Sequence, residues 1–147
     1  MVIAADADGL LYVSDWGNGR VRVFDLDGNY LYELGGGGTG DGELTNPTGL
    51  HVDQDANLWV VDRGNNRVQK FSRDGQFLAV YGSQGSNPGQ FLVPTSIAFD
   101  NEGNFYVSEV NNSRVQTFSP TGEYISELAP GLLATPHGLA FDHNGNL

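Results

Sequence analysis

The sequence contains no cysteine, which excludes disulfide bonds and thiolate metal sites and gives no redox indication of compartment. Basic residues are scarce, because 7 Lys and Arg stand against 18 Asp and Glu, for a formal net charge of −11. Nucleic-acid binding depends largely on basic side chains that neutralise phosphates. No apolar run approaches the ~18 residues of a membrane span, and no basic-then-apolar signal segment opens the sequence. We therefore expect neither nucleic acid nor a membrane as a partner.

Glycine is abundant instead, with 21 of 147 residues, alongside 6 prolines and only 17% charged residues. This composition is typical of short strands joined by tight turns, because helices use more Ala, Glu, Lys and Leu. With 39% hydrophobic and 11% aromatic residues, the chain can build a sizeable core. We predict a folded all-β protein whose acidic surface is compatible with cationic ligands or divalent metals.

Long segments of the sequence resemble one another. Residues 49–75 (GLHVDQDANLWVVDRGNNRVQKFSRDG) overlay residues 96–122 (SIAFDNEGNFYVSEVNNSRVQTFSPTG) at an offset of 47, and residues 2–28 fit the same offset. A truncated copy, PHGLAFDHNGNL, follows the third unit at an offset of 42. The chain therefore holds three full units and one partial unit, bounded at 1–47, 48–94, 95–135 and 136–147.

Each full unit alternates four short apolar runs with turn residues, which predicts four strands per unit. The expected innermost strands are residues 2–5, 49–53, 96–100 and 138–142, and the second strands are 10–15, 57–62 and 104–108. The third strands are expected at 20–25, 67–72 and 114–119, and the outer strands at 30–34, 77–81 and 124–128.

A repeat of about 40 to 50 residues with four strands and Gly-rich turns is typical of a β-propeller blade. A blade must bury its faces against neighbouring blades, so rings such as that of Phe71 in the middle unit are expected in the core. We predict an all-β fold of three propeller blades, each of four antiparallel strands, with one extra innermost strand within 136–147.

Two segments resemble a known repeat. PTGLHVDQDANLWVVDRGNNRVQKF (47–71) and PTSIAFDNEGNFYVSEVNNSRVQTF (94–118) are similar to the NHL repeat, with its P-x-G-I-A-V-D, Y-V-A-D and N-x-R-I-Q-x-F segments. The resemblance covers almost the whole chain. It implies a propeller that typically has six blades, of which this chain would supply about half.

Three blades outside a closed ring would expose two apolar faces, more than a monomer usually tolerates. Two copies related by a two-fold axis would supply six blades and cover both faces, so we predict a homodimer. The partial unit 136–147 duplicates the innermost strand at 2–5, which predicts that it exchanges into the partner's first blade. The alternative is a piece of a longer chain that is cut in mid-repeat at both ends.

Acidic and basic residues recur as pairs across the turn between the second and third strands. The pairs are Asp15 with Arg20, Asp62 with Arg67, and Glu109 with Arg114. Opposite charges can pair across a hairpin, while an asparagine in each intervening turn serves the turn itself. Because the pairs recur in every unit, we predict that their role is structural.

The loops between successive units, residues 35–47, 82–94 and 129–136, differ in length and content. Variable loops of a repeat array normally carry its binding specificity, so we expect a protein or a small molecule to bind there. The Gly-rich run 35–38 lacks the Lys-Ser/Thr ending and the following helix of a phosphate-binding loop, and we therefore reject that interpretation.

Histidine is the commonest metal ligand, and the chain has three. His143 lies in an Asp-His-Asn-Gly turn and is expected to be exposed. His51 stands on an innermost strand in a column that is alanine in the other units, which suggests a place in the channel or between blades. His137, in Pro-His-Gly at the start of an innermost strand, is the better metal candidate because equivalent residues converge on the channel axis.

The Pro-His-Gly placement of His137 resembles the metal-ligand position of the peptidyl-α-hydroxyglycine α-amidating lyases, six-bladed NHL propellers that use zinc to break a carbinolamide C–N bond. The resemblance extends to PGQF at 88–91 and NSRVQTFSPTG at 112–122. It implies a zinc or calcium ion on the axis. The corresponding residues of the two preceding units are Thr48 and Thr95, so a three-His site cannot be assembled within this chain.

Two functions are compatible with these observations. The first is a non-catalytic NHL scaffold that closes into a ring with a second copy and binds a protein or small ligand through its loops and channel. The alternative is part of a metal-dependent, lyase-like enzyme with His137 and His51 as metal ligands. Thr48 and Thr95 favour the first. No Ser-His-Asp spacing or Cys nucleophile suggests another enzyme, so we name no catalytic residue.

Overall fold

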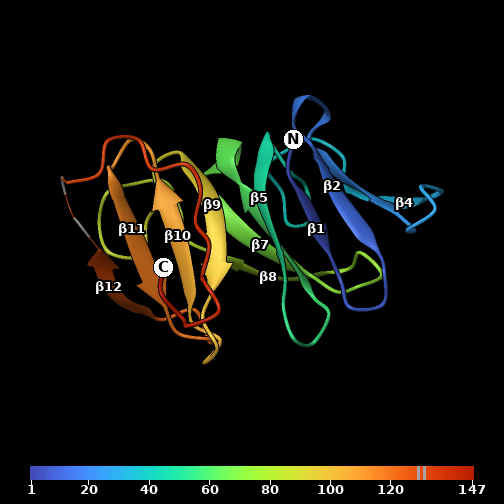
Figure 1. Cartoon of the computed structure of the whole chain (residues 1–147). Helices are drawn as coiled ribbons and strands as arrows, with labels where there is room; N and C mark the ends of the chain where they lie inside the picture. Colours follow the sequence, from blue (N-terminus) through green and yellow to red (C-terminus); the bar gives the residue numbers. More distant parts are fainter. Residues whose placement is uncertain (129, 131) are drawn as a thin grey trace.

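The computed structural model describes residues 1–128, 130 and 132–147. Within these residues the chain forms three four-stranded antiparallel sheets that stand side by side like the blades of a fan (Figure 1). In each sheet the strands follow one another in chain order, so every strand pairs with its sequence neighbour. This arrangement confirms the predicted all-β fold of propeller blades.

The strands lie within two residues of the positions predicted from the repeat. The first blade contains β1 (Ile3–Ala5), β2 (Leu11–Asp15), β3 (Arg20–Phe24) and β4 (Tyr30–Gly35). The second contains β5 (Pro47–Val52), β6 (Leu58–Asp62), β7 (Arg67–Phe71) and β8 (Phe77–Tyr81). The third contains β9 (Pro94–Phe99), β10 (Phe105–Glu109), β11 (Arg114–Phe118) and β12 (Tyr124–Leu128).

A recurring aspartate shapes the turn that follows each innermost strand. In the second blade one carboxylate oxygen of Asp53 accepts hydrogen bonds from the backbone nitrogens of Asp55 at 3.0 Å and Asn57 at 2.8 Å. Side chains that bond the backbone two and four residues ahead stabilise tight turns. The same pair of bonds forms at the equivalent positions, Asp6, Asp100 and Asp142.

The hydrophobic core lies between the blades rather than within one of them. The first cluster joins buried side chains of the first and second blades, and the second cluster joins the second and third. Phe71 belongs to the first cluster and is 1% exposed, as predicted from its place in the repeat. Each blade therefore depends on its neighbour for burial of its apolar face.

Residues 136–147 lie against the third blade without forming a strand. The segment, red in Figure 1, crosses β9 and β10, where the Thr95 hydroxyl donates to the Pro136 carbonyl at 3.0 Å. The Phe141 ring packs edge-on against the Tyr106 ring, with their centroids 5.0 Å apart. The extra strand expected at 138–142 is absent from the described chain, because an innermost strand needs the second strand of its own blade as its ladder partner.

The first blade has an open face on the side away from the second blade. Leu58, Val60 and Phe71 of the second blade are buried against the first blade, whereas the matching residues at 11, 13 and 24 are only partly buried. A hollow of about 490 Å³ lies over this open face.

None of the helices in the described part of the chain has the length and apolar character of a membrane span.

Candidate functional site

The acidic–basic pair of the second blade lies at the end of the hairpin formed by β6 and β7. Asp62 and Arg67 are register partners, and the Arg67 Nε donates to an Asp62 carboxylate oxygen at 2.7 Å. The Asp62 side chain is fully buried and that of Arg67 is 11% exposed. A buried charge of this kind requires several partners to compensate for its lost hydration.

Those partners come from the loop that leaves the first blade. The Arg67 Nη2 donates to the backbone carbonyls of Gly40 at 2.7 Å and Glu43 at 2.9 Å. The Asp62 carboxylate accepts a hydrogen bond from the backbone nitrogen of Thr45 at 2.7 Å. The ion pair therefore holds a loop of the preceding blade in place, in addition to closing its own hairpin.

Gln69 completes this contact from the next position on the same face of β7. Its side-chain nitrogen donates to the Glu43 carbonyl at 2.6 Å and to the Asp62 carboxylate at 3.0 Å. Its side-chain oxygen accepts from the Gly42 backbone nitrogen at 2.9 Å, and the side chain is fully buried. We call the four side chains that hold the loop the loop clamp of the second blade: Asp62, Asn65, Arg67 and Gln69.

The third blade has the same clamp, 47 residues later, formed by Glu109, Asn112, Arg114 and Gln116. Glu109 accepts from the Leu92 backbone nitrogen at 2.8 Å. Arg114 and Gln116 both donate to the Gln90 carbonyl, at 3.0 Å and 2.7 Å. The clamp is thus the repeated polar joint between consecutive blades.

The loop clamp of the first blade is formed by Asp15, Asn18, Arg20 and Arg22. The Arg20 Nε donates to Asp15 at 2.9 Å, and hydrogen bonds from Arg20 and Asn18 lower the pKa of Asp15. No loop within the described ranges is hydrogen-bonded to these side chains, and those of Asp15 and Arg20 are each 23% exposed. Arg22 replaces the clamp glutamine, with its Nε 3.6 Å from Asp15. This clamp is open.

The recurrence of the charged pairs predicted the ion pair across each hairpin. It did not predict the hydrogen bonds from the arginines to the loop of the preceding blade. Arg67 and Arg114 bind backbone carbonyls, which carry no residue-specific signal in a sequence. The clamp glutamines were also missed. Their signal is a column that holds Gln69 and Gln116 in the middle of strands whose other buried residues are mostly apolar.

His137 is exposed in the structure. At the matching position of the third blade, the Thr95 hydroxyl lies 3.0 Å from that of Ser108. In the part of the chain that the structure describes, no three His, Asp or Glu side chains gather closely enough to hold a metal ion. Since a zinc site takes three or four protein ligands, the described residues of one chain do not fit a zinc ion at His137.

His51 lies between the second and third blades. Its ring stacks on that of Phe99, with centroids 4.3 Å apart and an interplanar angle of 17°. Burial lowers the pKa of His51 below its ordinary value, and the nearby Asp53 carboxylate opposes this only in part. His51 lies on β5 of the second blade and belongs to an aromatic contact, whereas His137 belongs to the segment that lies against the third blade.

The fold is shared with several solved structures. A streptogramin B lyase superposes with a TM-score of 0.77 at 17% identity, covering 97% of this chain and 45% of the lyase. Virginiamycin B lyase from Staphylococcus aureus gives a TM-score of 0.77 at 16% identity, covering 99% and 46%. A chain of a nidogen/laminin complex gives a TM-score of 0.68 at 20% identity, and the match covers 92% of this chain and 49% of that one. Identities this low indicate a common fold, and this chain spans about half the length of each relative.

No curated protein matches the sequence. The model of the family DUF5128, described as a 6-bladed beta-propeller, matches residues 4–72 and 54–137. These two matches overlap, and together they span most of the sequence. The three sheets, the Asp turns and the inter-blade cores agree with that description. The chain belongs to this family of 6-bladed beta-propellers.

Proposed function

We propose that the chain is a non-catalytic, NHL-type propeller scaffold that closes a six-blade ring with a second copy of itself. Its loop and channel surfaces would then bind a protein or a small ligand. The observation that carries the proposal is the open loop clamp of the first blade. The clamps of the second and third blades each hold a loop of the preceding blade, whereas Asp15 and Arg20 hold none within the described residues.

The segment before residue 136 has the features of a loop that fits such a clamp. Leu44 and Phe91, three residues before the prolines that open β5 and β9, are fully buried. Leu133 stands at the same distance from Pro136. We infer that Leu133 of one copy fills the apolar pocket beside the open clamp of the other. The predicted loop 129–136 includes residues 129 and 131, which lie outside the described residues.

The backbone conformation of this segment supports the same assignment. Thr135 has a φ of 51°, and the residues before the other two blade-opening prolines, Asn46 and Val93, have φ of 51° and 56°. Positive φ is uncommon for residues other than glycine, and it is a genuine outlier for the β-branched Val93 and Thr135. Its recurrence before each proline is therefore a specific structural match. Thr135 therefore has the φ angle found before the first strand of a new blade.

The apolar surface of the first blade supplies the driving force for assembly. Ile3 is 57% exposed and Trp16 is 47% exposed, and Val13 and Phe24 line the hollow on the same open face. A blade of a second copy would cover this face in the way that the first blade covers the second. Two copies of three blades give the six blades of the family in a closed, two-fold symmetric arrangement.

A metal-dependent, lyase-like enzyme is the alternative. One observation favours it, because two of the similar solved structures are lyases. Thr48 and Thr95 occupy the positions that match His137 in the two preceding units, and they weigh against it because the lyase pattern would place a second histidine at 48. Closure of the ring would bring two copies of His137, which is still short of three ligands.

Paired substitutions in the segment before residue 136 test the proposal. Leu133→Asp places a charge in the apolar position, so we expect the dimer to dissociate at least about tenfold more readily. Leu132→Glu is the control, because Leu132 is 83% exposed and the matching residue of the first loop is Glu43. Sedimentation velocity across a concentration series measures the dissociation. Equal dimer affinity for wild type and L133D would overturn the proposal.

A second variant changes the open clamp of the first blade, which would contact the same segment of the partner copy. Arg20→Ala removes the side chain that would donate to the loop of the partner, and it should weaken the dimer by itself. Because R20A and L133D disrupt one interface, their combined effect should fall short of the sum of the two. A dimer affinity of R20A equal to that of wild type would place Arg20 outside the interface.

A further inference from the structure

Three residues of the second blade differ from the residues at the matching positions of the first and third blades. His51 replaces the alanines Ala4 and Ala98 of the first and third blades. Trp59 replaces the tyrosines Tyr12 and Tyr106, and Lys70 stands where the other blades have Val23 and Thr117. The strand register pairs His51 with Trp59 and Trp59 with Lys70. The three departures therefore form one row across β5, β6 and β7. Positions that break a repeat are where a site of a single blade is expected.

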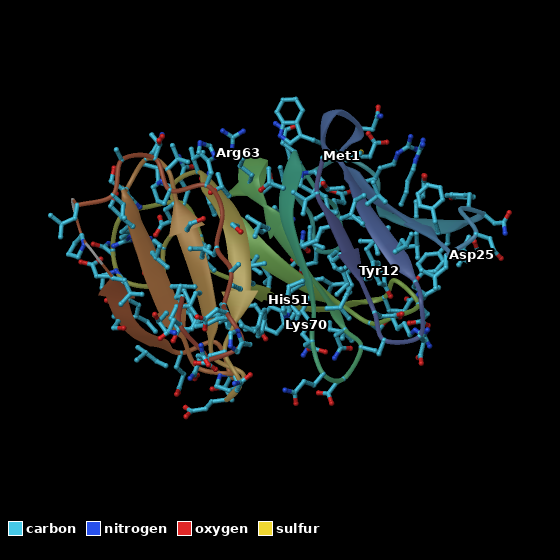
Figure 2. All side chains as sticks on the ribbon, viewed as in Figure 1. Met1, Tyr12, Asp25, His51, Arg63 and Lys70 are labelled. Carbon is cyan, nitrogen blue, oxygen red and sulfur yellow. The ribbon has the colours of Figure 1, made fainter. Side chains whose placement is uncertain are left out.

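This row borders a pocket of about 410 Å³ between the second and third blades. Its rim is formed by the turns after β5 and β9, which contribute residues 54–55 and 100–103. His51 and Lys70 are labelled close together below β5 in Figure 2. The volume lies within the range of small-molecule sites. Both blades that form the pocket are complete in one chain, so the pocket does not depend on closure of the ring.

The inner wall of the pocket is aromatic and closely packed. Trp59 is 2% exposed, and the Tyr81 ring stacks on it at 5.0 Å with an interplanar angle of 16°. The Lys70 Nζ lies 4.9 Å from the centre of the Trp59 ring. His51 and Phe99 form a second stacked pair beside it. These contacts fix the apolar wall before any ligand binds, which lowers the entropic cost of binding.

Asp53 forms an ion pair with Lys70, the cationic residue that lines the pocket. Its carboxylate accepts from the Lys70 Nζ at 2.9 Å and from the Trp59 Nε1 at 2.9 Å. Burial alone would raise the pKa of Asp53, but hydrogen bonds from Trp59, Lys70 and Asn57 outweigh it and leave that pKa below its ordinary value. Asp53 is therefore ionised at neutral pH, and its charge neutralises that of Lys70.

The remaining charges around the pocket are negative. Asp55, Asp100 and Glu102 line it, and Lys70 is the only Lys or Arg among the described residues that does. Because burial lowers the pKa of His51, this imidazole adds no positive charge near pH 7. A pocket with this balance repels anions and attracts cations. A bare metal ion does not fit, since within the described residues no three potential ligands converge.

We propose that this pocket binds a small organic cation, a protonated amine carried on an aromatic or alicyclic body. The ammonium group lies at the rim near Asp55, Asp100 and Glu102, and the body packs on the wall formed by His51 and Phe99. This inference rests on the binding role proposed above and gives it a site and a ligand class. It does not rest on the assembly of two chains.

Benzylammonium is the probe, and Trp59 is the reporter. The chain has two tryptophans, so Trp16→Phe leaves Trp59 as the source of tryptophan fluorescence. Titration with benzylammonium should give a saturable change that weakens as salt is added. Benzyl alcohol, of the same shape without the charge, should bind at least about fivefold more weakly, and phenylacetate should not bind.

Variants locate the site. Asp55→Asn combined with Glu102→Gln should weaken benzylammonium binding at least about fivefold. Lys70→Thr, which installs the residue of the third blade, should strengthen binding because it removes the positive charge. His51→Ala should weaken binding of both benzylammonium and benzyl alcohol. Asp27→Asn, on an exposed turn of the first blade, should change nothing and serves as the control for loss of a negative charge outside the pocket.

Two results would overturn the inference. One is the absence of a saturable signal below about 10 mM benzylammonium. The other is a D55N/E102Q variant that binds like D27N. The solution mass is recorded on the wild-type protein, because Trp16 lies on the face that a second copy would cover, so the two proposals fail separately. A dimer without benzylammonium binding rejects the pocket, and a monomer that binds benzylammonium rejects ring closure.

Discussion

The side-chain nitrogen of Gln69 donates a hydrogen bond of 2.6 Å to the backbone carbonyl of Glu43, which joins the second blade to the loop leaving the first. Gln116 makes the same contact with the Gln90 carbonyl at 2.7 Å. Neighbouring blades are therefore joined by a buried polar clamp as well as by an apolar core. The loop between two blades is a structural part of the joint.

The clamp predicts a large cost for removing its central carboxylate. Asp62→Ala should lower the free energy of unfolding by roughly 3–5 kcal/mol, because it leaves the largely buried Arg67 charge without its partner. The measurement is urea denaturation followed by circular dichroism. Asp27→Ala, at an exposed turn, is the control and should stay within about 0.5 kcal/mol of wild type. Equal effects of the two variants would show that the clamp does not stabilise the joint.

The core between the first two blades predicts a second large effect. Phe71→Ala should cost roughly 3–5 kcal/mol, because Phe71 is 1% exposed and its truncation leaves a cavity between blades. Leu78→Ala, on the same blade but 49% exposed, should cost much less. Thermal unfolding compares the two. An unchanged melting temperature for F71A would contradict the core assignment.

His51 predicts the pH dependence of stability. Its pKa in the folded protein lies below the ordinary value of about 6.5, so the unfolded chain binds more protons as the pH falls through that value. The free energy of unfolding should therefore decrease between about pH 7.5 and 5.5, before most carboxylates titrate. His51→Ala should show a shallower decrease over this range. Parallel curves for the two proteins would place His51 in a more exposed state.

Metal content distinguishes the scaffold from the lyase-like alternative. The purified protein should hold far less than one zinc ion per chain, and His137→Ala should not change its metal content, because the described residues assemble no three-ligand site. Elemental analysis after dialysis against zinc and calcium measures both. Stoichiometric zinc that is lost in H137A would favour the enzyme.

The strands and turns could be predicted from the repeat because their causes are local. The aspartate at 53 and its counterparts bond the backbone two and four residues ahead, and the strand alternation follows the apolar columns. The segment 136–147 differed from expectation. It keeps the Asp142 turn but lacks a ladder partner, so its sequence likeness to an innermost strand did not produce a strand.

The contacts between blades could not be predicted in the same way. The partners of Arg67 are carbonyl groups 24 and 27 residues away, and any residue can supply a carbonyl. One residue of the pocket could be identified from the sequence, because His51 occupies a column that is alanine in the other units. Its link to Lys70 needed the register of three strands, which places residues 19 positions apart in one row.

The solution mass of the protein tests the central claim most directly. Light scattering coupled to size exclusion, repeated over a range of concentrations, measures it without labels or variants. Closure of a six-blade ring by two copies predicts a mass of twice 15.8 kDa that persists on dilution. A mass of 15.8 kDa at every concentration would contradict the account, because the open clamp of the first blade would then have no partner copy.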